Sequence, residues 1–379
     1  MNKKLIKASE EYKSWFVNDA LPLWSSKAIN SVNGASYERL LNNGEPDLSA
    51  NVRLRVQARQ MFVFCLATEL KWMSGGENIV SRMAEFVDSC GRHPAGGYVH
   101  LLDTHYDVID KKQDLYDHAF FLLANAWRFR VFKQESALED ANNILGLLNN
   151  KFSMLNGGWT EGDYETDRRR QNPHMHLFEA FLALYEASDN KKWLELAGEM
   201  FALFENYFFD KKNAALLEYF DDDWSPLKGE DGLIIEPGHM MEWVWLLRNF
   251  SRHSGVDVDA CADELYKKAL NYGMAENGLM FDELFLDGSI KKASKRCWPM
   301  TELIKASIAQ AKAGRTECEE VAANALVALK KHYLTVSTAG AYIDQLDEND
   351  QVVVDFAPAS TLYHLIVAAA ESDAYVTSN

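Results

Sequence analysis

The chain has 379 residues, 47% of them hydrophobic, so it can bury a large core. Its 56 Asp and Glu residues outnumber 39 Lys and Arg, and the resulting net charge of -17 opposes binding to nucleic acid or to anionic lipid. The charge therefore argues against a nucleic-acid partner. No apolar run approaches the roughly 20 residues that a membrane span needs, so we expect no membrane anchor either.

An apolar run that predicts a buried helix recurs along the chain, at residues 60–66, 119–123, 177–182, 243–247, 303–308 and 365–369. Immediately before these runs stand Arg59, His118, His176, Glu242, Glu302 and His364. The intervals between these polar residues are 59, 58, 66, 60 and 62 residues. Recurrence at a nearly constant spacing indicates a repeated supersecondary unit.

Each repeat is predicted to contain an inner helix, an amphipathic outer helix and a turn rich in glycine and aromatic residues. The inner segments are apolar almost all round, as at 243–247, whereas an outer segment such as 191–201 has one apolar face. We therefore predict an all-α fold, an (α/α)6 barrel of six inner and six outer helices with short β-hairpins at the active-site mouth. Residues 1–379 would form one catalytic domain. An open solenoid of the same helix pairs is the alternative.

Histidines gather where the inner helices are predicted to begin, at one common face of the barrel. Histidine exchanges protons near neutral pH, so His239 and His364 are candidates for proton transfer. For His118 a helix cap or a satisfied core group is the alternative. His239 and Glu242 lie one helical turn apart, but this spacing alone is a weak indication of a metal site, and we predict no metal and no cofactor.

Other polar and aromatic residues near the same helix starts are candidates for binding substrate. Asn172, before Pro173, suits either a helix N-cap or hydroxyl binding. Arg55 and Arg59 lie one turn apart and would either neutralise buried glutamates or bind substrate oxygens. Trp298 and Tyr116 could offer an apolar face to a sugar ring.

The amino terminus and the cysteines indicate the compartment. Basic residues at the start are followed by Glu10 and Glu11 without an apolar segment, which does not support a secretory signal. The cysteines are odd in number and form no CxxC pair, which favours free thiols; they are Cys65, Cys90, Cys261, Cys297 and Cys318. We expect a cytoplasmic protein that could form a homodimer.

Five motifs resemble those of the N-acylglucosamine 2-epimerase superfamily, which includes cellobiose 2-epimerases and mannose isomerases. They are Arg-x-Gln-Ala-Arg (55–59), Asn-Pro-His-Met-His (172–176), Glu-Pro-Gly-His-Met-Met-Glu-Trp (236–243), Arg-Cys-Trp-Pro-Met-Thr-Glu (296–302) and Tyr-His (363–364). The resemblance implies an (α/α)6 barrel with a metal-independent aldose site. It also implies acid/base roles for His239 and His364, and a sugar lined by Arg55, Asn172, His176, Glu242, Trp298 and Glu302. From their places in the repeat we add Tyr116, His118 and Arg59 to the binding residues.

The resulting hypothesis is an aldose–ketose isomerase, with mannose and fructose as the expected pair and a cis-enediolate intermediate. His364 would take the C2 proton and His239 would open the ring, with Glu242 orienting His239 and Arg55 stabilising the oxyanion. A 2-epimerase acting on a monosaccharide or a cellobiose-type disaccharide is the alternative. Ala359 stands where cellobiose epimerases carry a tryptophan, which favours a monosaccharide.

Two further classes remain open at this stage. A glycoside hydrolase would need a carboxylate pair, for which Asp163 or Glu165 with Glu242 or Glu302 are candidates. A non-catalytic sugar-binding toroid would bind without turnover, and it gives no reason for histidines at the helix starts.

Overall fold

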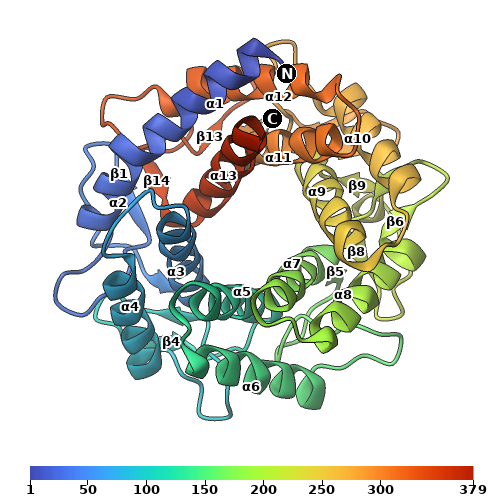
Figure 1. The fold of residues 1–379 in the computed structure, drawn as a ribbon. Coiled ribbons are helices and arrows are strands. Elements are labelled where there is room, and N and C mark those ends of the chain that lie inside the picture. Colours follow the sequence, from blue (N-terminus) through green and yellow to red (C-terminus); the bar gives the residue numbers. More distant parts are fainter. Residues whose placement is uncertain (379) are drawn as a thin grey trace.

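The computed structural model describes residues 1–378 and is mostly helical, so the predicted all-α class is confirmed (Figure 1). The inner ring consists of α3 (Leu54–Glu69), α5 (Leu115–Phe132), α7 (Gln171–Ser188), α9 (Pro237–Ser254), α11 (Trp298–Lys312) and α13 (Leu362–Ser378). Outside it lie α1 (Lys3–Trp15), α2 (Leu21–Lys27), α4 (Gly76–Cys90), α6 (Glu135–Lys151), α8 (Lys191–Leu203), α10 (Asp259–Gly273) and α12 (Cys318–Leu329).

Burial explains why the two rings differ in sequence. Every side chain from Asp117 to Asn125 of α5 is buried, because this helix is covered by its inner neighbours and by the outer ring. In α4 the buried positions Val80, Met83 and Val87 follow helical spacing and leave the opposite face to solvent. Fully burying a large apolar side chain contributes about 1.5–3 kcal/mol, so the inner helices depend on the packing around them.

The first turns of the inner helices are held in different ways. Asp114 is the N-cap of α5, and its carboxylate accepts a hydrogen bond from the Asp117 amide at 3.2 Å. In α7 the N-cap residue is Arg170, which makes no side-chain capping bond. Asn172 is already inside the helix, so the capping interpretation of this residue is wrong and its amide is available for another role.

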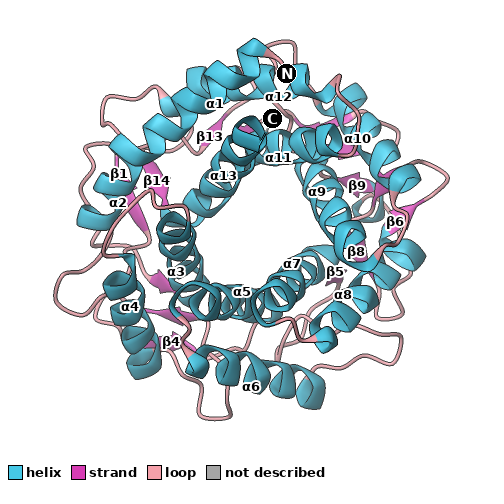
Figure 2. Ribbon diagram, viewed as in Figure 1, coloured by secondary structure: helices cyan, strands magenta, loops and turns pink. Residues whose placement is uncertain are grey.

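Short antiparallel strands are spread around the ring (Figure 2). They are β1 (Arg39–Leu41), β2 (Val52–Arg53), β3 (Leu101–Leu102), β4 (Val108–Asp110), β5 (Arg169–Arg170), β6 (Phe209–Asp210), β7 (Ala215–Leu216), β8 (Tyr219–Phe220), β9 (Ile234–Ile235), β10 (Glu283–Phe285), β11 (Ile290–Lys292), β12 (Lys295–Arg296), β13 (Gln345–Leu346) and β14 (Phe356–Pro358).

Most of the strand pairs that precede an inner helix join neighbouring units, where we had expected hairpins. The pairs β2–β3, β5–β8, β9–β10 and β12–β13 each connect the strand before an inner helix to a strand beyond the next outer helix. Before α5 a single bridge between Asp114 and Gly162 takes this place. Local hairpins are formed by β3–β4, β6–β7 and β10–β11. The pairs between units fix the starts of the inner helices relative to one another.

The ring is closed by contacts between the two ends of the described chain. β1 pairs with β14, α3 packs against α13, and α1 packs against both α12 and α13 (Figure 1). The Tyr12 hydroxyl donates to the Leu365 carbonyl at 2.8 Å, and Lys13 pairs with Asp373 at 2.8 Å. An open solenoid would leave these surfaces apart, so the structure favours the closed arrangement.

Candidate active site

A cavity of about 390 Å³ lies at the amino-terminal ends of the inner helices. Its walls include eight of the predicted site residues: Arg59, Tyr116, Asn172, His176, His239, Glu242, Trp298 and His364. Three predicted residues, Arg55, His118 and Glu302, are not part of its lining. Its volume falls within the range of small-molecule sites.

Trp298 separates the two histidines predicted to transfer protons. Its ring centroid is 5.1 Å from that of His239 and 5.5 Å from that of His364. The indole lies against α9 at Gly238, where a Cβ atom would come within 2.6 Å of the Trp298 ring. Glycine is therefore required at position 238 for this indole to lie between the histidines.

His239 is held by a glutamate that the sequence analysis did not single out. Its Nδ1 is 3.0 Å from Oε2 of Glu218, which also accepts a hydrogen bond from Gln171 at 2.9 Å. Glu236 lies 3.9 Å from the same nitrogen. Burial opposes a charge on His239, but Glu218 and Glu236 outweigh it and raise the pKa of His239 to about 9. The predicted orienter, Glu242, forms no hydrogen bond with His239 among the described residues, so that assignment is corrected to Glu218.

The second nitrogen of His239 faces the amide of Asn172 at 3.2 Å. Asn172 can donate to a neutral ring through Nδ2, whereas a protonated ring needs the amide turned so that Oδ1 accepts. Asn172 Oδ1 is buried and has no partner in the described part of the chain. The raised pKa of His239 favours the second orientation, which satisfies that oxygen.

His364 has the opposite electrostatic setting. Its Nδ1 is 2.8 Å from Oε1 of Glu302, whose other oxygen lies 2.6 Å from the ammonium of Lys305. Burial, together with the positive charges of Arg59 and Lys305, lowers the pKa of His364 well below its usual range. Glu302 is fully buried and does not line the cavity, so it acts on His364 and does not meet the sugar as we had expected.

Lys305 keeps this buried group of charges in balance. Burial opposes its charge, but Glu302 and Glu242 raise the pKa of Lys305, so the ammonium persists. Burial and the nearby Glu242 raise the pKa of the Glu302 carboxyl well above its ordinary value, and the Lys305 ammonium opposes that rise. An ionised Glu302 accepts the Nδ1 proton of His364 and leaves Nε2 as a lone pair. His239 is thus suited to be an acid and His364 a base at the same pH.

His118 has a structural role, contrary to the prediction that it binds substrate. It is fully buried, its Nδ1 donates to the Asp114 carbonyl at 2.7 Å, and its Nε2 accepts from the Tyr98 amide at 3.1 Å. His174 in the next unit makes the same pair of backbone contacts, to Arg170 and Trp159.

The equivalence of His118 and His174 also corrects the register of the repeat. In α5 the residue that corresponds to His176 is Phe120, whose ring centroid lies 4.5 Å from that of His176. A shift of two residues along a helix turns a side chain away from the cavity. His118 was therefore assigned to the wrong face.

Of the two arginines of the first motif, Arg59 lines the cavity and Arg55 does not. Arg55 pairs with the buried carboxylate of Asp117 at 3.0 Å, so it is not available as the predicted oxyanion donor. Arg59 lines the cavity, donating to the Ser360 carbonyl at 3.1 Å and to the Tyr116 hydroxyl at 2.5 Å, while its Nε has no hydrogen-bond partner among residues 1–378. Arg59 is the guanidinium placed to meet substrate oxygens.

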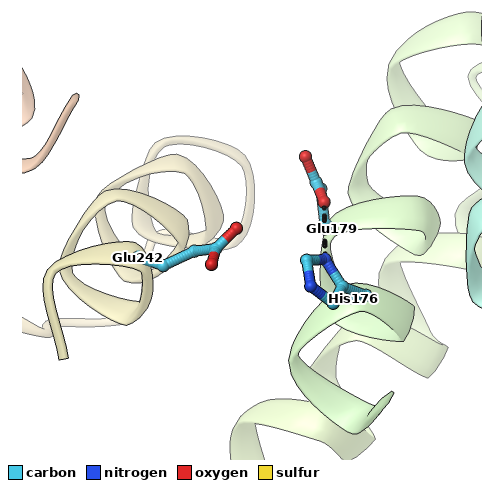
Figure 3. A group of neighbouring side chains, drawn as sticks. All are labelled: His176, Glu179 and Glu242. Atoms are coloured by element: carbon cyan, nitrogen blue, oxygen red, sulfur yellow. Dashed lines mark hydrogen bonds and ion pairs between the residues drawn. The ribbon is translucent and has the colours of Figure 1, made fainter. Parts of the chain in front are cut away.

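Glu242 and His176 face each other from α9 and α7 (Figure 3), and both line the cavity, where we call them its floor. Glu242 is 1% exposed, and within the described chain neither of its carboxylate oxygens has a hydrogen bond; the nearest cation is Lys305 at 3.8 Å. Potential metal-ligand atoms of His176, Glu179 and Glu242 lie within 4.8 Å of one another, as do those of Glu242, Glu302 and His364. Lys305 already supplies a positive charge beside the second group.

The residues considered for a hydrolase do not form a catalytic pair. Asp163 accepts a hydrogen bond from the Gln113 amide at 2.7 Å, and neither Asp163 nor Glu165 belongs to the cavity lining. Ala359, considered as a marker of substrate size, is fully buried, and its neighbours Pro358 and Ser360 line the cavity instead.

Three charged residues that contact the cavity glutamates or histidines were not among the predicted site residues: Glu218, Lys305 and Glu179. Lys305 and Glu179 interrupt runs that are otherwise apolar, and a charge inside a helix covered on both sides must have a buried partner. That signal could have found them. Glu218 lies in an extended turn, and only its distance from His239 in the folded chain reveals its role.

Comparisons with known proteins agree with this geometry. The sequence pattern of the family described as N-acylglucosamine 2-epimerase (GlcNAc 2-epimerase) matches residues 35–368. A mannose-6-phosphate isomerase of Rhizobium meliloti (strain 1021) is 32% identical over 370 residues, which is 95% of each chain. A D-mannose isomerase crystal structure superposes with a TM-score of 0.85 at 21% identity, covering 98% of both chains.

A cellobiose 2-epimerase structure from Spirochaeta thermophila DSM 6192 gives a TM-score of 0.87 at 18% identity, covering 99% of this chain and 98% of that one. At these identities the two structures support the fold alone. In addition, no helix within residues 1–378 is long and apolar enough to span a bilayer.

Proposed function

Because the chain belongs to the N-acylglucosamine 2-epimerase family, we propose that it is an aldose–ketose isomerase that interconverts mannose and fructose without a metal ion. We assign the double ring to one (α/α)6-barrel catalytic domain with the cavity as its active site. One observation carries the proposal: two histidines with oppositely shifted pKa values flank a tryptophan in a sugar-sized cavity.

The first step is the opening of the aldose ring. His239, protonated over most of the neutral range, donates its proton to the ring oxygen as the C1–O5 bond breaks, and it then accepts the proton that the anomeric hydroxyl loses, so it ends this step protonated. Glu218 stabilises the protonated imidazole and fixes its orientation through Nδ1. Trp298 provides a flat apolar surface on which the carbon skeleton can rest between the two histidines.

Isomerisation then requires a proton to move between two carbons. Nε2 of His364 takes the proton from C2, the C–H electron pair forms the C1–C2 double bond, and O1 is protonated by His239. His239 recovers a proton from O2, the carbonyl forms at C2, and His364 returns its proton to C1 on the same face. Arg59 stabilises the negative charge that develops on the enediolate oxygens.

The charges around the cavity favour a free sugar over a sugar phosphate. Arg53 is paired with Glu38, and Arg296 with Asp282 at 3.0 Å and Glu236 at 2.9 Å, so these guanidinium groups are already neutralised. The lining also contains the carboxyl groups of Asp344 and Glu242. Arg59 is the one arginine of this lining without a carboxylate partner among residues 1–378, and in the proposed reaction it meets the enediolate oxygens. A phosphate dianion would therefore meet this negative charge without a second free guanidinium to compensate for it. We therefore propose mannose itself as the substrate, although the Rhizobium relative carries the name of a mannose-6-phosphate isomerase.

The test is incubation of the purified protein with mannose or mannose 6-phosphate in excess chelator, followed by chromatography of the products. We expect fructose from mannose and little product from the phosphate. Glucose without fructose would replace the isomerase with a 2-epimerase, because the proton would then return to C2 from the opposite face. Activity restricted to the phosphate would refute the charge argument, and no product from any aldose would refute the enzyme proposal.

A further inference from the structure

In each of the three cavity histidines Nδ1 faces a glutamate, but only two of these pairs take part in the proposed reaction. Nδ1 of His239 faces Glu218, Nδ1 of His364 faces Glu302, and Nδ1 of His176 faces Glu179. The structural histidines His118 and His174 instead direct Nδ1 at backbone carbonyls. The pair of His176 and Glu179 therefore resembles the two catalytic pairs, but it has no part in the proton transfers described above.

Glu179 is surrounded by donors. Its Oε2 lies 3.2 Å from Nδ1 of His176 (Figure 3). The Tyr363 hydroxyl donates to both carboxylate oxygens, at 2.5 Å for Oε2 and closer still for Oε1. Glu179 is 5% exposed and does not line the active cavity; it contributes instead to a second cavity, of about 330 Å³, beyond the floor of the first. Any effect of Glu179 on the sugar must therefore pass through His176.

The protonation of His176 follows from these contacts. Burial raises the pKa of the Glu179 carboxyl, whereas Lys305, the Tyr363 hydrogen bond and Arg59 oppose that rise and favour the carboxylate. A carboxylate can only accept, so Nδ1 of His176 carries the hydrogen. Burial lowers the pKa of His176 to about 3 against the opposing charge of Glu242, so the ring has a single proton at neutral pH. Nε2 is then an unprotonated acceptor, and the His176 ring lies opposite the carboxylate of Glu242, with potential ligand atoms of the two residues within 4.8 Å of each other (Figure 3).

We propose that Glu179 is a positioning residue that fixes the tautomer of His176, so that Nε2 accepts a hydrogen bond from a sugar hydroxyl beside the free oxygens of Glu242. The floor then presents acceptors only, and it selects a substrate that can donate two hydroxyl protons there. A cation is a poorer occupant, because both oxygens of Glu179 are engaged by Tyr363 and His176. The identity of the ligand, a sugar, rests on the proposed function. The tautomer of His176 does not.

The substitution Glu179→Gln tests the proposal directly. A buried glutamine amide must place its two N–H groups, and the acceptors within reach are Nδ1 of His176 and the Tyr363 hydroxyl oxygen. With one N–H directed at each, the ring should change to the tautomer with the proton on Nε2. The floor would then present a donor where the sugar also donates. We expect KM for mannose to rise about tenfold or more while kcat stays within about threefold.

The matched control is Glu186→Gln, the same change on α7 farther from the active cavity, where Glu186 pairs with Arg130 at 3.2 Å. It should leave KM unchanged. Equal effects of the two substitutions, or a loss of kcat without a change in KM, would overturn the proposal.

A second measurement reports the tautomer of His176 directly, without the Glu179→Gln protein and without any turnover of substrate. The ¹⁵N spectrum of histidine-labelled wild-type protein, assigned with His176→Asn, should show protonated Nδ1 and unprotonated Nε2 for His176. A proton on Nε2 in the wild type would refute the role of Glu179 even if the enzyme isomerises mannose. Conversely, an inactive protein with the expected spectrum would refute the proposed function and leave the tautomer assignment standing.

Discussion

Replacing Glu218 with glutamine should move the alkaline limit of activity to lower pH. A pKa of about 9 for His239, against the ordinary 6.5, corresponds to about 3 kcal/mol of preference for the protonated ring. Glu218, at 3.0 Å, contributes most of this preference, and Glu236, at 3.9 Å, contributes less. With Glu236 still present we expect the pKa of His239 to fall to about 7 in Glu218→Gln.

The assay is the pH dependence of kcat/KM for fructose formation from mannose between about pH 6 and pH 10. With a pKa of about 9 nearly all His239 is protonated at pH 8, whereas a pKa near 7 leaves about a tenth, so the rate at pH 8 should fall about tenfold. Glu236→Gln should move the same limit by a smaller amount. An alkaline limit that stays near pH 9 in Glu218→Gln, with the rate lowered equally at all pH values, would refute the assignment of Glu218.

The same substitution has a thermodynamic signature. Because the folded-state pKa of His239 is raised, its contribution to stability is present below about pH 6.5 and is lost as pH rises towards 9. The difference in the free energy of unfolding between wild type and Glu218→Gln should therefore be largest near pH 6 and shrink as the solution becomes alkaline. A difference that grows with pH would contradict the stated charge of the pair.

Three further predictions follow from the site. His364→Asn should abolish exchange of the C2 proton of mannose with deuterated solvent, whereas His239→Asn should keep some exchange when an open-chain aldose is supplied; full exchange in His364→Asn, measured by NMR, would reverse the assignment of the two histidines. Gly238→Ala should displace Trp298, because the added Cβ would lie 2.6 Å from the indole. We expect KM to rise with little loss of helical circular dichroism, and unchanged kinetics would show that the indole is free to move. Stability in urea should fall as pH drops below about 6.5, because the pKa values of His176 and His364 are lowered and only the unfolded chain takes up the protons. His176, with a pKa of about 3, should account for about 2 kcal/mol at pH 5, and His176→Asn should reduce the slope.

The repeat allowed the fold to be predicted, because a helix covered on both sides must be apolar all round. Residues 243–247 and 365–369 show this directly, and both lie in inner helices. The same reasoning located the helix starts that form the cavity. The spacing of apolar residues was therefore enough to predict the all-α class, which the structure confirms.

The precise face of each helix was harder to predict, because a shift of one or two residues decides which side chain enters the cavity. Arg55 and Arg59 are both polar and one turn apart, and only the position of Asp117 on the neighbouring helix determines that Arg55 is neutralised. His118 could not be distinguished from a catalytic histidine without its backbone contacts. Pairings between distant segments, such as that of Glu218 with His239, are set by tertiary structure and leave no local signal.

The pairing of β1 with β14 makes formation of the active cavity a late event in the synthesis of the chain. Inner helices that are consecutive in sequence are neighbours in the ring, so they can dock as they leave the ribosome. The cavity nevertheless requires His364 from α13, which meets α3 only when the final unit has been made. We expect Glu242 and Lys305 to stay hydrated until then, which would avoid the cost of burying charges before their partners arrive. A nascent chain should therefore gain helical structure gradually and acquire sugar binding in a single final step.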